Sequence, residues 1–280
     1  MSFLEHLAEL RLRLRNAAIV FLVAVVVSFI FVKKYFTVLV RPATDAWRAV
    51  LPAGKEPIFN FFDPTEPFWV YTKLAIIGAL LVASPFVLWE LWKFVAPGLY
   101  RKERRLVMVI TVATALCFLG GALFGYFVLC TPALSYMFSF AESMGGFTIQ
   151  PTIGMNHLVG FMLAMLLGTG AAFELPIVMA VLGWIGIVSS KQLLKFDKYA
   201  LILSALVGGV LTPGPDILSQ LLMAGPLFAL YNISIVIVWL IERARKKQLA
   251  ELEKSYADGG ESSSLVPSDE SAGTPAAPTS

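Results

Sequence analysis

Charged residues are scarce in this sequence of 280 residues. Only 15% of the residues are charged, whereas 58% are hydrophobic and the mean hydropathy is +0.76. Soluble globular domains are about one quarter charged. A soluble core cannot bury so much apolar surface, so the composition indicates a protein for which lipid is the main solvent. The net charge of +3 is too small to suggest nucleic acid as a partner.

Cysteine and histidine are also rare. Cys117 and Cys130 lie on one predicted helix, where a rise of about 1.5 Å per residue separates them by roughly 20 Å and excludes a disulfide. With His6 and His157 as the only histidines, the sequence holds no Cys/His zinc pattern. Signatures of metalloproteases, serine hydrolases and P-loop proteins are absent as well. We therefore predict that the chain is not an enzyme and has no catalytic residue, metal site or cofactor.

Six apolar segments predict an all-α polytopic membrane protein with six transmembrane helices. A membrane-spanning helix needs about 20 mostly apolar residues. The predicted spans cover residues 16–32, 70–92, 106–129, 158–183, 199–211 and 217–241. The fifth is short and closely linked to the sixth through Pro213-Gly214-Pro215, so it crosses a thinned bilayer or stops before the far face. Pro85 and Pro176 lie inside the second and fourth spans and predict kinks.

We place the transmembrane domain at residues 1–245; it includes an N-terminal segment before the first span and is followed by a tail. Residues 2–15 begin with the capping-box pattern Ser2-x-x-Glu5 and continue with apolar residues at helical spacing. This pattern predicts a short amphipathic helix on the membrane surface, or alternatively an extension of the first span. Residues 246–280 are predicted to form a largely disordered cytoplasmic tail, because the sequence from about Tyr256 onward is rich in Ser, Gly, Pro and Ala.

The basic residues predict the orientation of the chain. Sixteen of the 22 Lys and Arg residues fall in four segments on one side of the predicted membrane: 11–15, 93–105, 191–198 and 243–254. The other six lie between residues 33 and 73. Because basic loops stay in the cytoplasm, we expect both termini to be cytoplasmic in a multi-pass protein of a bacterial inner membrane.

Glu174 is the most specific candidate for a functional residue. It lies well inside the predicted fourth span and is followed by Pro176, which frees a backbone carbonyl on the same turn. A carboxylate at membrane depth is costly and by default indicates a functional site. The alternative is a structural hydrogen bond to a neighbouring helix. Since no intramembrane Lys, Arg or His is available as a partner for it, we expect Glu174 to face water or to be protonated.

Two acidic residues on the predicted cytoplasmic face form a second candidate site. Glu103 is an isolated acid in the basic loop 93–105, and Glu9 lies beside Arg11 and Arg13. Together they could bind guanidinium groups of a partner, since carboxylates and Arg pair in a bidentate manner. The alternative is that both acids only neutralise their own basic surroundings.

Three further polar residues have simpler interpretations. Glu90 is expected to pair with Lys93 at i,i+3 spacing at the membrane interface. Asp216 is expected to cap the sixth helix. Gln220 is expected to form an interhelical hydrogen bond, either within one chain or between two chains.

Four motifs in the same order resemble the TatC family, the multispanning receptor subunit of the twin-arginine protein translocase. The resemblance covers roughly residues 3–245. Its motifs are the N-terminal F-L-E-H-L-A-E-L-R (3–11), the loop F-V-A-P-G-L-Y-R-K-E-R-R (94–105), F-E-L-P (173–176), and L-T-P-G-P-D followed by S-Q (211–220). Gly214 departs from the family's T-P-P-D turn and puts the placement of Asp216 in doubt.

The resemblance implies a receptor that binds twin-arginine signal peptides of folded cargo proteins, with transport driven by the proton motive force. It implies that Glu9 and Glu103 receive the arginine pair and that Phe94 shapes the same surface. It further implies that Thr212 and Gln220 contact single-span partner subunits of the TatA and TatB type, and that the chain self-associates within a complex surrounded by membrane lipid. The alternative function is a proton-coupled secondary transporter that uses Glu174.

Overall fold

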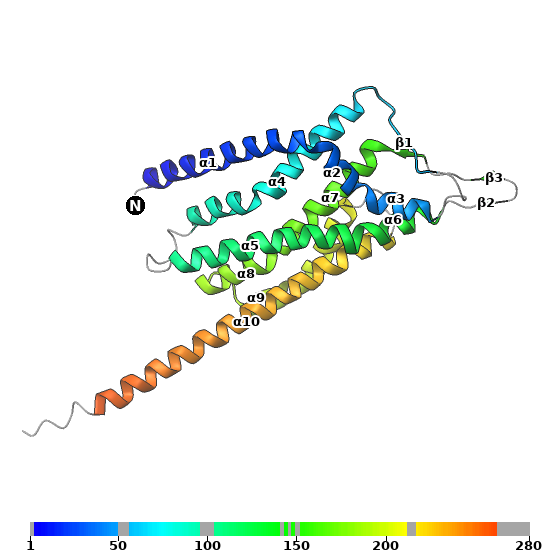
Figure 1. The fold of residues 1–280 in the computed structure, drawn as a ribbon. Coiled ribbons are helices and arrows are strands. Elements are labelled where there is room, and N and C mark those ends of the chain that lie inside the picture. Colours follow the sequence, from blue (N-terminus) through cyan, green and yellow to red (C-terminus); the bar gives the residue numbers. More distant parts are fainter. Residues whose placement is uncertain are drawn as a thin grey trace, which may run out of the picture.

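The computed structural model describes residues 3–49, 56–95, 104–140, 143–144, 147–148, 152–211 and 217–261. The described residues form a bundle of long helices, with short helices and strands gathered at one end (Figure 1). The long helices are α1 (Phe3–Ile30), α4 (Glu66–Val95), α5 (Arg104–Phe124), α7 (Met155–Phe173), α8 (Leu175–Ile185), α9 (Ser190–Leu211) and α10 (Ile217–Glu261). The predicted all-α fold class is confirmed.

Among the described residues, five helical segments are long and apolar enough to cross a membrane. They are Leu7–Ile30, Glu66–Phe94, Met108–Phe138, Met155–Ile185 and Ser219–Glu253. Each overlaps one predicted span. The predicted fifth span, residues 199–211, forms the second part of α9. The first part of α9 carries Lys191, Lys195, Asp197 and Lys198, so its apolar stretch of about 20 Å is shorter than a hydrocarbon core of about 30 Å.

The segments before the first predicted span and after the sixth both lie in long helices. The continuous helix α1 contains both the proposed amphipathic segment and the first span up to Ile30, because no Gly or Pro interrupts residues 3–30. Likewise, α10 runs through residues 246–261, which we had assigned to the tail. This stretch is rich in Lys, Glu, Leu and Ala, all strong helix formers, and Lys247 pairs with Glu251 at 3.8 Å.

Proline and a π-helical turn interrupt two of the long helices. The fourth predicted span is divided, with α7 ending at Phe173 and α8 beginning at Leu175, because Pro176 has no N–H to continue the α7 ladder. The third span passes from α5 through a π-helix (Gly125–Cys130) into α6 (Thr131–Phe138). Pro85, where we also predicted a kink, lies inside the single helix α4.

The end of the bundle opposite the N-terminus carries a small cap (Figure 1). It contains α2 (Val32–Leu39), α3 (Arg41–Arg48), α6 and four short strands: β1 (Phe59–Asn60), β2 (Ser143–Met144), β3 (Phe147–Thr148) and β4 (Ile153–Gly154). Strand β1 pairs in parallel with β4, and β2 pairs antiparallel with β3. Trp47 is the centre of the cap, with its ring 5.8 Å from those of Phe59 and Phe138. Phe59 therefore joins β1 to the cap.

Glycines allow α5 and the π-helix to approach α7 closely. A Cβ on Gly121 would lie 2.7 Å from the carbonyl oxygen of Thr169, and a Cβ on Gly125 would collide with the Thr169 hydroxyl. Gly121 and Gly125 are four residues apart, which is the spacing of small residues at close helix contacts in membranes. This contact fixes α7, and with it the break at Glu174, against α5.

Candidate functional site

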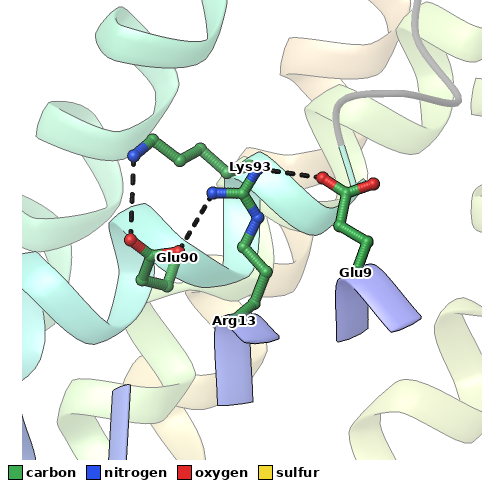
Figure 2. A network of polar contacts seen from close by, with 4 residues as sticks. All are labelled: Glu9, Arg13, Glu90 and Lys93. Atoms are coloured by element: carbon green, nitrogen blue, oxygen red, sulfur yellow. Dashed lines mark hydrogen bonds and ion pairs between the residues drawn. The ribbon is translucent and has the colours of Figure 1, made fainter. Parts of the chain in front are cut away.

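Four charged side chains join α1 to α4 at the end of the bundle that holds the N-terminus (Figure 2). The Arg13 guanidinium donates hydrogen bonds to Glu9 at 2.9 Å and to Glu90 at 3.1 Å. Lys93 lies 3.7 Å from the other oxygen of Glu90. The predicted pair of Glu90 with Lys93 is confirmed, but Glu90 also bonds to Arg13, on a helix 77 residues away in sequence.

Burial differs among these four residues. The Glu90 side chain is only 7% exposed, whereas Glu9 is 21% and Lys93 is 34% exposed. A buried carboxylate needs charged partners, and Glu90 has two of them. Glu9 is at the open edge of the network, and in Figure 2 its second oxygen points away from Arg13. Glu9 can therefore accept a hydrogen bond from a further donor while it keeps its hydrogen bond with Arg13.

Two of the three residues predicted to bind the signal peptide are described by the structure, and both lie near this network. Glu9 is on α1, and Phe94 is the residue after Lys93 on α4, where it is half-buried. Glu103 lies outside the described residues, but it immediately precedes Arg104, the first residue of α5. Figure 1 shows the start of α5 at the same end of the bundle as α1.

Glu174 is the residue between α7 and α8. It is half-buried, and its Oε1 atom is buried without a hydrogen-bond partner among the described residues. The interhelical hydrogen bond that we considered as a structural alternative is not formed within that part of the chain. Its neighbour Phe173 packs on Phe124 of α5, with ring centroids 5.4 Å apart. The carboxyl group can therefore accept a hydrogen bond from a ligand or hold a proton, because an unpaired buried charge is costly.

Gln220 forms the interhelical hydrogen bond that the sequence predicts. Its Nε2 atom donates to the backbone oxygen of Ala205 at 2.9 Å, joining α10 to α9 within one chain. Gly208 and Gly209 provide the space for this contact, since a Cβ on Gly209 would lie 3.2 Å from the same Nε2 atom. The other residues of this predicted region, Thr212, Gly214 and Asp216, lie outside the described residues.

Three polar residues with specific contacts were not predicted as structural links. The sequence analysis used Arg13 only as a basic residue, although its i,i+4 spacing from Glu9 indicates an ion pair between the two side chains. Glu66 accepts hydrogen bonds from the backbone N–H groups of Phe62 at 2.9 Å and Asn156 at 2.7 Å, holding α4 beside α7. Glu242 accepts bonds from both the N–H and the hydroxyl of Ser190. No local pattern indicates the last contact, because its partners are 52 residues apart.

The described residues contain no group of three or more His, Cys, Asp or Glu side chains placed to hold a metal ion. The polar site at this end of the bundle consists of carboxylates and the cations that partly neutralise them. Such carboxylates can accept hydrogen bonds from positively charged groups.

Comparison with known proteins gives consistent results. A family model for the Sec-independent protein translocase protein (TatC) matches residues 5–226. The chain is 33% identical over 255 residues to the TatC protein of Koribacter versatilis, covering 91% of both chains. It is 34% identical over 250 residues to that of Aquifex aeolicus, covering 88% of this chain and 98% of the relative. The structure matches the crystal structure of a twin-arginine translocase receptor, TatC, with a TM-score of 0.72 and 32% identity, covering 85% of this chain and 99% of that one.

Proposed function

The chain belongs to the TatC family of Sec-independent protein translocase proteins, a multi-pass membrane component of protein transport, and from this we propose that it is the receptor that binds twin-arginine signal peptides. The observation that carries the proposal is the Glu9 carboxylate. It is paired on one oxygen with Arg13, while its second oxygen points away from that residue (Figure 2). This arrangement suits a guanidinium group from a second protein.

In the proposed site, Glu9 and Glu103 bind the two arginines and Phe94 contacts the adjacent apolar part of the signal peptide. The proximity of α1, the end of α4 and the start of α5 in Figure 1 supports this grouping. Arg13 and Lys93 hold Glu90 and leave Glu9 as the more accessible acid. The family membership does not favour the alternative of a proton-coupled secondary transporter.

We further propose six spans with both termini in the cytoplasm of a bacterial inner membrane, α9 being the short fifth span. Two features support this orientation: the four basic segments, and the presence of the N-terminus, the start of α5 and the distal half of α10 at one end of the bundle (Figure 1). A bilayer that thins beside α9 would accommodate its short apolar stretch. Glu174 would then face a water-accessible concavity, and Thr212 and Gln220 would contact single-span partner subunits.

Photocrosslinking tests the receptor proposal. A photoreactive amino acid at Phe94, in membranes that contain the full chain and its partner subunits, should crosslink a twin-arginine signal peptide. The double variant Glu9→Gln/Glu103→Gln should lose this adduct, and so should a peptide in which two lysines replace the arginines. Glu251→Gln is the matched control, because it removes one carboxylate from an exposed ion pair on α10. Equal crosslinking by the double variant and the control would refute the site.

A further inference from the structure

Four aromatic side chains are exposed around the turn that precedes α4. Phe61 and Phe62 lie before the turn, and Phe68 and Trp69 lie on the first turn of the helix; each is between 56% and 69% exposed. The rings of Phe68 and Trp69 are 5.7 Å apart in an edge-on arrangement. We call these four residues the aromatic patch. A contiguous apolar patch is unfavourable in water and indicates a surface that contacts something else.

The turn inside the aromatic patch satisfies its own polar groups. The Asp63 carboxylate accepts hydrogen bonds from the N–H and the hydroxyl of Thr65, at 2.7 and 2.6 Å. The Glu66 carboxylate accepts bonds from the N–H groups of Phe62 and Asn156. These bonds fix the turn between Phe62 and α4. Irregular backbone does not occur in lipid-exposed parts of the hydrocarbon core, so a turn of this kind belongs at the interface, where water remains available.

The aromatic patch lies at the level where two membrane-crossing segments begin. These segments are Glu66–Phe94 and Met155–Ile185. Their first turns are joined, because Glu66 accepts a hydrogen bond from the Asn156 N–H at 2.7 Å. Phe62 lies beside the same junction, since a Cβ on Gly154 would stand 2.9 Å from the Phe62 ring. The starts of α4 and α7 therefore share one depth, and Phe62 lies at that depth.

The aromatic patch also continues a surface of α4 that faces lipid. Trp69 and Ile76 are seven residues apart and so share one face of the helix. Ile76 is exposed inside the span, where lipid surrounds the bundle. Val70, the residue after Trp69, is fully buried and belongs to the inward face. Figure 1 shows the turn before α4 at the periphery of the bundle, where lipid can reach it.

We propose that the aromatic patch inserts into the lipid interface at the end of the bundle opposite the N-terminus and anchors the cap at a fixed depth. Aromatic rings favour this layer because they contact hydrocarbon and water together. The acids Asp63 and Glu66 outweigh Lys73 beside the patch, so we expect no preference for anionic headgroups. The bond from Glu66 to Asn156 carries the depth of the patch to α7. This inference depends neither on signal-peptide binding nor on which side of the membrane the cap faces.

Spin labelling of the full chain in phosphatidylcholine vesicles tests the depth of the patch. Labels are attached at Phe62→Cys, at Phe68→Cys and at Arg48→Cys, in a background of Cys117→Ala and Cys130→Ala. Collisions with oxygen, which concentrates in lipid, are compared with collisions with a water-soluble nickel chelate. We expect the oxygen-to-nickel ratio to be several-fold higher at positions 62 and 68 than at position 48, an exposed site on α3.

Removing one ring tests whether the patch sets the depth. Phe61→Ser, in the chain labelled at Phe68→Cys, should move the label toward water and lower its oxygen-to-nickel ratio. Phe61→Trp should keep the ratio, because it retains an aromatic ring. Phe140→Ser is the matched control, since it removes an exposed ring from another part of the cap and should leave the ratio unchanged.

Three results would overturn the proposal. Ratios at positions 62 and 68 as low as the ratio at position 48 would place the patch in water. Protection of both labels from both reagents would show that protein covers the patch, as a second copy of the chain would. Equal ratios at position 68 in the Phe61→Ser and Phe140→Ser variants would show that the patch does not hold the cap at its depth.

Discussion

The guanidinium group of Arg13 on α1 donates a hydrogen bond to the Glu90 carboxylate on α4 across 3.1 Å. The same group contacts Glu9 at 2.9 Å, so two carboxylates from two helices share one cation. A ligand guanidinium that approaches Glu9 therefore meets an acid that is already paired on one oxygen. How firmly Glu90 holds Arg13 should affect how strongly Glu9 binds a ligand.

Replacing Arg13 should affect binding and stability in opposite directions. Arg13→Gln removes a positive charge beside Glu9, which is worth about 1 kcal/mol at about 4 Å in water, or roughly fivefold tighter binding of a twin-arginine peptide. It also takes a donor from the largely buried Glu90 and should lower the free energy of unfolding by about 1–3 kcal/mol. Fluorescence anisotropy with a labelled peptide and thermal unfolding of the full chain in detergent measure the two effects.

The matched variant Glu90→Gln should weaken peptide binding, because Arg13 then relies on Glu9 alone for its negative partner. We expect a loss of a few-fold, measured in the same anisotropy assay. If Arg13→Gln and Glu90→Gln change peptide affinity in the same direction, Arg13 does not compete with the ligand for Glu9.

Cysteine labelling tests the proposed topology. A cysteine at Ile58, which is 67% exposed near β1, should react with a membrane-impermeant reagent added to intact cells. A cysteine at Lys195 should react only after permeabilisation. The parent chain, with Cys117 and Cys130 inside the bundle, is the control. The reverse labelling pattern would invert the assigned orientation.

Two Glu→Ala substitutions separate function from structure. Glu174 makes no hydrogen bond through its carboxylate to the described residues, so Glu174→Ala leaves no protein group unpaired and should impair export with little loss of stability. Glu242→Ala removes two bonds to Ser190 and should destabilise the fold by about 1–3 kcal/mol. Protein level, thermal unfolding and export are measured for both variants. If Glu174→Ala is the less stable of the two, Glu174 has a structural role.

Glycine substitutions in α5 and the π-helix test the close contact with α7. Gly125→Ala places a methyl group into the Thr169 hydroxyl, and overpacking of this kind costs about 1–3 kcal/mol. Gly120→Ala is the matched control, since its Cβ would meet nothing within 4 Å. Thermal unfolding in detergent should show a lower midpoint for Gly125→Ala alone, and Thr169→Ala should partly restore it. Equal midpoints for the two glycine variants would show that the contact does not limit stability.

Local patterns predicted the helices and several contacts correctly. Hydropathy predicted six spans, and five of these coincide with described helices that are long and apolar enough to cross a membrane. The i,i+3 spacing of Glu90 and Lys93 predicted their ion pair. Pro176 predicted a kink in the fourth span, and the structure divides this span into the two helices α7 and α8. Gln220 was predicted to bond between helices, but its spacing could not identify the Ala205 carbonyl as the acceptor.

The sequence by itself determined that lipid surrounds this protein and that its spans are helical. It also identified the acidic residues that are candidates for function. Composition and periodicity suffice for these conclusions because each can be read within a few helical turns. Only the tertiary structure decided that Arg13 is shared between Glu9 and Glu90, that Glu242 accepts hydrogen bonds from Ser190 and that α7 to α10 enclose an apolar groove. The Arg13–Glu90 and Glu242–Ser190 contacts join residues 77 and 52 positions apart. Their formation depends on how helices pack, which in a membrane is set by shape and close approach rather than by hydrophobicity.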